Sequence, residues 1–297
     1  MDIIKHKKIF LSFSFLMVAV ATAALVFYWF TPGVDFKSGS LWQMRLPGAE
    51  EKEVRVFLRD SLKVSEPIIS YDASADSYSL LLPEMSPERK AADFEALKAR
   101  FPGAEELDFW STSPSVSSEL KNKAFLAIAL VLLVISLYVT LAFSSVSRPI
   151  SSYKYGIAAL IALVHDAVIA AGFYAILSHF KGFVADTNLI VALLTIVGFS
   201  AHNTIVVFDR IRENFLRRND DVDKTINRSI NETFRRSVNT SLTLILVLLA
   251  VYFWGPASIR YFALTILVGT TVGTYSSIFL ASPILSAWYH LDAKRKK

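Results

Sequence analysis

Six long apolar runs separate the polar segments of this 297-residue chain, and they constrain its fold more than any other feature. Each is close to the roughly 20 residues that a helix needs to cross a hydrocarbon core of about 30 Å. A hydrophobic content of 53% and a mean hydropathy of +0.43 are too high for a soluble globular protein of this size. We therefore predict a polytopic α-helical membrane protein with six transmembrane helices. The runs are Ile9–Phe30, Ala124–Phe143, Tyr155–Ser178, Asn188–Phe208, Val238–Trp254 and Tyr261–Trp288. The second transmembrane helix is predicted to start slightly before its run, at residue 121.

The first run follows a short tail, residues 1–8, that contains three lysines. A basic tail before an apolar run is also typical of a signal peptide. The apolar stretch is about 22 residues long, whereas the core of a signal peptide has roughly 7–15 residues. We therefore expect an uncleaved membrane anchor.

Basic residues next to the runs predict which way the helices face, because lysine and arginine accumulate on the cytoplasmic side. The 144–154 loop carries Arg148 and Lys154, the 209–237 connection carries eight basic residues, and the 289–297 tail ends in Lys294, Arg295, Lys296 and Lys297. With six spans, these segments and the N-terminal tail all lie on one side. Segment 31–120, on the other side, has ten basic and sixteen acidic residues. Both termini are thus predicted to be cytoplasmic.

Segment 31–120 is long enough for a small extracytoplasmic domain. Its residue patterns predict the order βαββαβ, which is typical of a ferredoxin-like α+β sandwich. Ser111–Ser118 is serine-rich and is predicted to be a linker back to the membrane. The predicted elements are a strand at Ser40–Leu46, a helix at Ala49–Leu62, strands at Glu66–Tyr71 and Tyr78–Leu82 around the turn Asp72–Ser77, a helix from Pro87 to Arg100, and a strand at Leu107–Trp110.

The chain has no cysteine, which excludes disulfides and thiolate metal sites. Its net charge of +5 is modest, and the basic residues gather at the ends of apolar runs, which indicates membrane topology rather than nucleic-acid binding. We expect no cofactor and no metal.

Two ionisable residues, His165 and Asp166, lie near the middle of the third run. An ionised aspartate there costs about 2.5–3.5 kcal/mol even on the gentler insertion scales, so it needs a partner, water or a proton. Consecutive helix positions point about 100° apart, so we expect the two side chains to find partners on neighbouring helices rather than to pair with each other. The alternative role is a polar pair that only holds helices together.

The fourth run contains a polar stretch, Gly198–Thr204, with His202 and Asn203 inside it. Gly198 is small enough to let another helix come close, or the stretch serves only close packing. Arg236, at the start of the fifth run, is placed to reach inward toward Asp166 or this stretch, whereas Arg235 reads as a topology marker.

The end of the fourth run and the sixth run carry two further patterns. Asp209, Arg210 and Arg212 continue the fourth helix into the cytoplasm, where by themselves they indicate a solvated, charged helix end. The small residues of the sixth run favour tight packing against a helix of this chain or of a partner. They are Gly269, Thr270, Thr271, Gly273, Thr274, Ser276, Ser277 and Ala281.

Segment Thr195–Asn214 resembles the fourth-span signature of SecF proteins. Four other segments agree with this family in order and spacing, so the resemblance covers the whole chain. They are Gly33–Ser40 (with Gly33, Asp35 and Gly39), His165–Gly172, Arg236–Leu242 and Gly273–Ser277.

The resemblance implies a non-enzymatic half-transporter of the RND superfamily in the bacterial inner membrane. It would pair with a SecD-like subunit, work beside the SecYEG translocon and use the proton motive force to help move exported, unfolded polypeptide. The candidate ion-coupling residues are Asp166, His165, His202, Asn203 and Arg236.

Two positions depart from the family pattern. Asn203 stands where the family usually has an aspartate, and an amide cannot titrate. Either carboxylates of the SecD-like partner handle the protons, or His202 has taken over. Ser38 stands where the family favours glycine, which we expect to alter only the flexibility of a turn.

Two other functions remain open at this point. A related half-transporter that exports a small hydrophobic solute or lipid would share the span pattern, but such exporters usually carry far larger extracytoplasmic domains than 31–120. An intramembrane metalloenzyme using His165, Asp166 and His202 would need a fuller ligand set than the chain contains.

Overall fold

The computed structural model describes residues 2–64, 67–72, 76–144, 149–181, 183–217 and 220–295. It divides into two compact units. The helical unit comprises Met1–Tyr28, Ala127–Ala175 and Leu189–Lys297, and the sheet unit comprises Trp29–Leu126 and Ile176–Asn188. Several residues used in the sequence predictions lie outside the described ranges: Arg148, Lys296, Lys297, Glu66 of a predicted strand, and residues 73–75 of a predicted turn.

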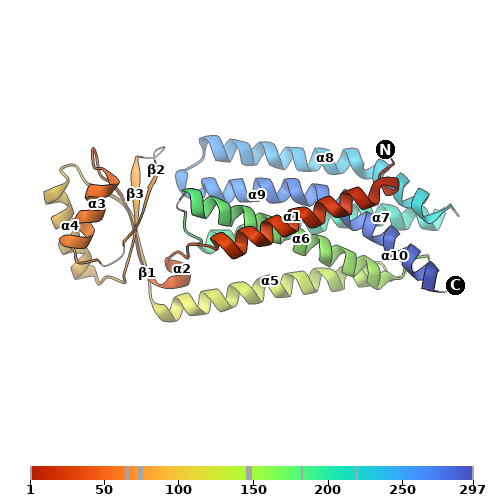
Figure 1. Cartoon of the computed structure of the whole chain (residues 1–297), viewed down its shortest axis with the longest axis horizontal. Coiled ribbons are helices and arrows are strands. Elements are labelled where there is room, and N and C mark those ends of the chain that lie inside the picture. Colours follow the sequence, from red (N-terminus) through yellow and green to blue (C-terminus); the bar gives the residue numbers. More distant parts are fainter. Residues whose placement is uncertain are drawn as a thin grey trace. The chain divides into compact units, whose positions relative to one another are not determined.

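Six helices in the described part of the chain are long and apolar enough to cross a membrane, which fits a polytopic helical membrane protein (Figure 1). The fourth and the fifth extend into the predicted 209–237 connection, which is therefore largely helical. The sixth is interrupted by one π-helical turn. The helices are α1 (Lys7–Tyr28, preceded by a 3₁₀ turn at Ile4–His6), α5 (Pro114–Ala142), α6 (Ser152–Lys181), α7 (Thr187–Arg217), α8 (Val222–Trp254), and α9 (Ala257–Ser276) with its continuation η2 (Ser277–Ala281) and α10 (Ser282–Arg295).

The sheet unit has the predicted βαββαβ order. Its sheet has the strand order β2-β3-β1-β4, and all neighbouring strands are antiparallel. In Figure 1 the two helices that follow β1 and β3 lie on the same face of the sheet. The elements are β1 (Gly39–Arg45), α3 (Glu51–Asp60), β2 (Ile68–Asp72), β3 (Ser77–Leu82), α4 (Pro87–Arg100) and β4 (Glu105–Thr112).

Apolar side chains on one face of the sheet pack against α3 and α4 to form the core of this unit. Trp42 and Met44 alternate along β1 with less buried residues, as expected for a strand with one covered face. Val54 and Leu58, one helical turn apart on α3, are fully buried in the same cluster. The hydrophobic pattern of the sequence therefore decides which face of each element points inward.

The predicted linker Ser111–Ser118 is wrong. β4 continues to Thr112 and α5 begins at Pro114, so one residue separates strand from helix. Proline suits the first turn of a helix, because its missing N–H would have no helical partner there. The Ser117 hydroxyl donates a hydrogen bond to the carbonyl oxygen of Val34 at 2.8 Å, which holds the start of α5 in place.

The glycine-rich segment before β1 contains a short helix that the sequence did not predict, α2 (Val34–Lys37). One Asp35 carboxylate oxygen accepts hydrogen bonds from the Thr187 backbone N–H at 2.9 Å and the Thr187 hydroxyl at 2.7 Å. A side chain at Gly33 would come within 2.9 Å of the Ala185 carbonyl oxygen. Gly39 has φ +129°, and a side chain there would meet a β3 carbonyl at 2.5 Å. These family-pattern residues thus have structural roles inside the sheet unit.

Ser38 has φ +63° and ψ +159°, a conformation that is essentially restricted to glycine. The serine therefore introduces backbone strain, which is more than the change in flexibility that the sequence suggested. We expect Ser38→Gly to raise the free energy of unfolding by about 1 kcal/mol, after allowing for the larger entropy of glycine in the unfolded chain. Chemical denaturation in detergent measures this gain. Ser38→Ala keeps the Cβ atom and is the control; an equal gain in both variants would contradict the strain.

Candidate functional site

Asp166 of α6 is completely buried and accepts hydrogen bonds from three side chains. The His165 Nδ1 lies 2.8 Å from Asp166 Oδ1. The hydroxyl of Ser276, at the end of α9, donates to Asp166 Oδ2 at 2.7 Å, and the Ser200 hydroxyl of α7 donates to the same oxygen. Three membrane-spanning helices therefore meet at one carboxylate.

The contact between His165 and Asp166 corrects the prediction that these neighbours would not pair. Their Cβ atoms do point in different directions on the helix. The ring of His165 is long enough, however, for its Nδ1 to reach back to the carboxylate. His165 is 4% exposed, so both partners are shielded by the bundle. The prediction of partners on neighbouring helices is correct for Ser200 and Ser276.

Glycines of α9 bring α7 close enough to form this cluster. A Cβ atom at Gly273 would lie 3.1 Å from Ser200 Cβ and 3.4 Å from Asp166 Oδ2. At Gly269 it would lie 2.3 Å from the Ile196 side chain. The small residues of the sixth run therefore pack against α7 of this same chain. A Cβ at Gly198, in contrast, would meet nothing within 4 Å, so no helix in the described part of the chain approaches that glycine as predicted.

A matched pair of alanine substitutions tests this packing. We expect Gly273→Ala to lower the free energy of unfolding by about 1–3 kcal/mol, because the added methyl group presses on Ser200 and the carboxylate. Gly198→Ala has open space, and we expect no loss, or a small gain from the better helix propensity of alanine. Thermal unfolding of the purified chain in detergent distinguishes the two, and similar losses in both would argue against this packing.

Several polar side-chain atoms of the membrane-spanning helices are buried without a hydrogen-bond partner. The Nε2 atom of His165 is one of them, and Nδ2 of Asn203 is another. A buried polar group that lacks a partner usually costs about 1–3 kcal/mol, so each such group calls for an explanation, such as a bound water or a proton. Further examples on α7, α8 and α9 are the hydroxyls of Thr204, Ser237 and Thr270.

The other predicted ion-coupling residues do not join Asp166. His202 and Arg236 are exposed on this chain, as is Asp209. Asn203 is 2% exposed, yet it makes no hydrogen bond to Asp166. Within the described ranges, no lysine or arginine forms an ion pair with the carboxylate. His165 is thus its one potential cation there.

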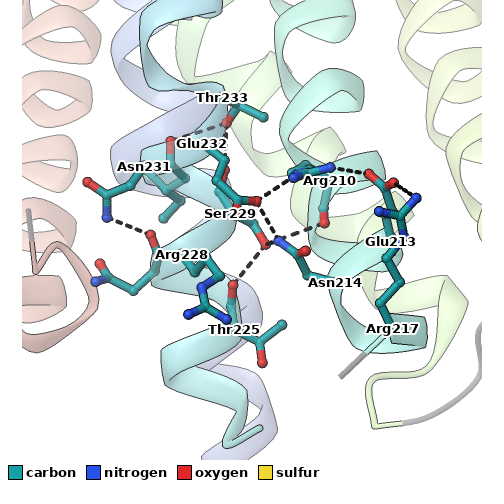
Figure 2. A network of polar contacts seen from close by, with 12 residues as sticks. Arg210, Glu213, Asn214, Arg217, Thr225, Arg228, Ser229, Asn231, Glu232 and Thr233 are labelled. Carbon is teal, nitrogen blue, oxygen red and sulfur yellow. Dashed lines mark hydrogen bonds and ion pairs between the residues drawn. The ribbon is translucent and has the colours of Figure 1, made fainter. Parts of the chain in front are cut away.

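A second polar network joins the ends of α7 and α8 (Figure 2). Arg210 donates to Glu232 at 2.6 Å and to Glu213 at 2.5 Å. The buried Asn214 side chain donates to Ser229 at 2.9 Å and to Glu232 at 2.8 Å. The prediction that Arg210 belongs only to a solvated helix end is therefore incomplete, because its ion pair with Glu232 joins α7 to α8. Arg212, by comparison, contacts Asp209 at 3.9 Å.

Sequence reasoning missed the specific roles of Ser200 and Ser276. Ser200 was noted only as part of the polar stretch of the fourth run, and Ser276 only as a small packing residue, although hydroxyl groups within lipid-buried helices were the available signal. The π-helical turn η2, which starts directly after Ser276, was not predicted either. π-helical turns occur frequently at functional sites.

The arrangement can bind a proton or another small cation. The carboxylate accepts from two hydroxyl groups and lies beside one imidazole. No group of three or more histidine, aspartate or glutamate side chains in the described segments could hold a metal ion.

Comparisons with known proteins agree with this architecture. The family model for "Protein export membrane protein SecD/SecF, C-terminal" matches residues 94–291. The chain is 40% identical to the protein translocase subunit SecF of Thermobaculum terrenum, over 99% of this chain and 96% of that protein. It is 37% identical to the protein translocase subunit SecDF of Thermus thermophilus, over 92% of this chain but only 36% of that protein.

Solved structures extend the likeness to three dimensions. The crystal structure of SecDF, a translocon-associated membrane protein from Thermus thermophilus, superposes with a TM-score of 0.85 at 35% identity, covering 98% of this chain and 39% of the other. SecDF in a super-membrane-facing form gives a TM-score of 0.67 at 30% identity. The chain thus spans about two fifths of the SecDF chains.

Fold and site together define a polytopic helical membrane protein of the protein-export class, with a polar cluster buried between its helices. The full-length matches narrow this class further. The chain belongs to the SecF family of protein translocase subunits.

Proposed function

We propose that this SecF-type subunit uses the proton motive force to assist Sec-dependent translocation of polypeptides. The observation that carries the proposal is Asp166, a completely buried carboxylate in a membrane-spanning helix without a lysine or arginine partner in the described chain. Such a residue is costly to keep and is usually functional. One charge crossing the membrane potential supplies about 2.3 kcal/mol per 100 mV, enough to bias a two-state movement.

The coupling site in this proposal is the Asp166 cluster rather than the family's usual fourth-span carboxylate. Asn203 cannot titrate, and His202 lies on the exposed face of α7. Arg236 remains a candidate through contacts outside this chain, since it is exposed here.

The proposed topology places both termini in the cytoplasm of a bacterium and segment 31–120 outside its inner membrane. The distribution of basic residues supports this orientation. The βαββαβ order and the antiparallel β2-β3-β1-β4 sheet support a ferredoxin-like domain there.

The proposed first partner is a SecD-like subunit. The SecDF relatives contain more than twice the length of this chain, which suggests a companion half. An exposed stripe on α7 supports such a partner, because polar groups facing lipid are costly and a second protein would cover them. The stripe contains Thr195, Gly198 and His202. The SecYEG translocon and an exported, unfolded polypeptide complete the proposed assembly, and we propose no covalent catalysis.

Reconstituted vesicles test the proposal. The chain should copurify with a SecD-like subunit, and adding the pair to vesicles that contain the translocon should increase export only when a proton gradient is present. Vesicles treated with a protonophore are the control. Isolation of this chain in a stable, active complex that lacks a SecD-like subunit would reject the proposal. Stimulation of export that persists after protonophore treatment would also reject it.

A further inference from the structure

We propose that the helical unit binds an anionic phospholipid, with one acyl chain in a groove between α8 and α9 and the phosphate held by Arg235. The site is separate from the Asp166 cluster in the residues it uses, and it needs neither proton transfer nor export. It depends on the proposed topology only for the assignment of the groove to the cytoplasmic leaflet.

An open groove of about 220 Å³ runs between α8 and the helix formed by α9 and η2. These two helices lie side by side in Figure 1. On α8 the groove extends from Phe234 to Ile245, and on the other side it is lined as far as Phe279 of η2. The ring of Phe279 also packs against Phe10 of α1, with a centroid distance of 4.6 Å. The first membrane-spanning helix therefore borders the groove.

The hydroxyl groups that line the groove already have partners within the chain. The Ser241 and Thr274 hydroxyls lie 2.5 Å apart. The Thr271 hydroxyl donates to a backbone carbonyl one turn earlier at 2.9 Å, and the Tyr275 hydroxyl donates to the carbonyl oxygen of Phe10 at 3.1 Å. A ligand therefore meets apolar surface without unused hydrogen-bonding groups. Such a surface suits a hydrocarbon chain and does not suit a peptide backbone, whose polar groups need partners.

The groove has the depth of one membrane leaflet. From Phe234 to Ile245, α8 rises about 16 Å, and half of a hydrocarbon core is about 15 Å thick. Phe234 precedes the fifth apolar run, Val238–Trp254, and Ile245 lies near the middle of that run. The groove thus begins at the membrane surface and ends near the bilayer centre. A lipid chain fits this depth, whereas a partner's transmembrane helix would need a groove through both leaflets.

Arg235 lies at the end of the groove that faces the membrane surface. It comes three residues before Val238 and seven before Leu242, which both line the groove, so it shares their side of α8. Arg235 is exposed and forms no ion pair with another described residue. The nearest carboxylate on α8, Glu232, is already engaged by Arg210. The guanidinium is therefore available for an anion.

The start of the chain brings a second cation to the same end of the bundle. The Ile3 backbone N–H donates to Asn227 Oδ1 at 2.8 Å, which joins the first turn to α8. Lys5, two residues later, is exposed, and its ammonium group has no ion pair in the described ranges. Long basic side chains lie along apolar surface and place their charges at the level of the lipid headgroups. Basic pockets between helices at the cytoplasmic surface bind anionic headgroups in this way.

Photo-cross-linking in vesicles tests the proposal. The full chain is reconstituted with its SecD-like partner in equal amounts of phosphatidylglycerol and phosphatidylcholine that have the same acyl chains. Benzoylphenylalanine replaces either Leu242, in the groove, or Leu137 of α5, which is similarly exposed and lies at a similar depth in its apolar run. Any lipid-facing position contacts lipid, so the readout is the headgroup of the cross-linked lipid. We expect phosphatidylglycerol to be enriched about fivefold at Leu242, which corresponds to about 1 kcal/mol from one basic residue, and not at Leu137.

Two adjacent arginines provide matched variants. Arg235→Gln should remove the enrichment at Leu242. Arg236→Gln should preserve it, because consecutive helix positions point about 100° apart. Thr271→Phe adds a ring on the exposed side of the groove and should also remove the enrichment, since the acyl chain loses its space.

Equal enrichment at Leu242 and Leu137, or enrichment that persists in Arg235→Gln, would overturn the proposal. Enrichment that persists in Thr271→Phe would mean that the headgroup binds without a chain in the groove, and it would reject the acyl-chain site. Cross-linking of Leu242 to another protein chain instead of lipid would mean that a helix covers the groove, which also rejects the proposal. None of these outcomes depends on proton-driven export, so the proposed function is tested separately.

Discussion

Asp166→Asn should reduce proton-gradient-driven export to the level seen without a gradient. Asparagine has nearly the same size as aspartate, and its amide oxygen can still accept from Ser200 and Ser276. It cannot take up or release a proton, so the fold is kept while the coupling chemistry is lost. Export into vesicles, measured with and without an imposed proton gradient, gives the result.

Two positions on α7 serve as controls for this loss. Asp209→Asn changes an exposed carboxylate and should leave the gradient-dependent component intact. Asn203→Asp restores the carboxylate usual in the family, and we expect it to be tolerated. We also expect Arg236→Ala to impair gradient-dependent export. If neither Asp166→Asn nor Arg236→Ala has an effect, the site lies elsewhere.

Trp42→Ala should destabilise the sheet unit by about 3–5 kcal/mol, the usual loss for removing a large aromatic side chain from a core. Trp42 is completely buried, and its indole N–H donates to Glu106 Oε2 at 3.0 Å. Its ring packs against Phe94 and Phe109, each with a centroid distance of 5.8 Å. Since most domains are stable by only 5–15 kcal/mol, this loss would bring the unit close to unfolding.

Trp110→Ala is a matched control in the same sheet, because Trp110 of β4 is 61% exposed. We expect its change in free energy to lie within about 0.5 kcal/mol. Pulse proteolysis of the full chain in detergent, over a denaturant series, reports the stability of the sheet unit for both variants. Equal losses would mean that the packing of Trp42 does not support this unit.

The two predictions concern separate properties of the molecule. The first concerns whether the helical unit couples export to a proton gradient through Asp166, as proposed, and the second concerns whether the sheet unit stays folded. Asp166→Asn should therefore leave protease resistance of the sheet unit unchanged.

Much of the fold could be predicted from the sequence, because burial follows local patterns. Runs of about 20 apolar residues require helices in lipid, and the alternation around Trp42 and Met44 requires a strand with one covered face. The ends of a helix could not be predicted where the helix continues beyond its apolar run. The extension of α7 to Arg217 depends on contacts of Arg210 and Asn214 with α8, which lie far from it in sequence.

The candidate site could be predicted only in part, because its partners also come from segments that lie far apart in the sequence. The sequence alone showed that Asp166 is energetically costly in the membrane, because a carboxylate in a lipid-spanning run must be compensated by other groups. Its compensation by Ser200 and Ser276 depends on the packing of α7 and α9 against α6, across separations of 34 and 110 residues. The sequence by itself determined that an ionisable carboxyl group lies inside an apolar run. Only the tertiary structure decided which groups surround it, because hydrogen-bond partners are set by distance in space rather than by position along the chain.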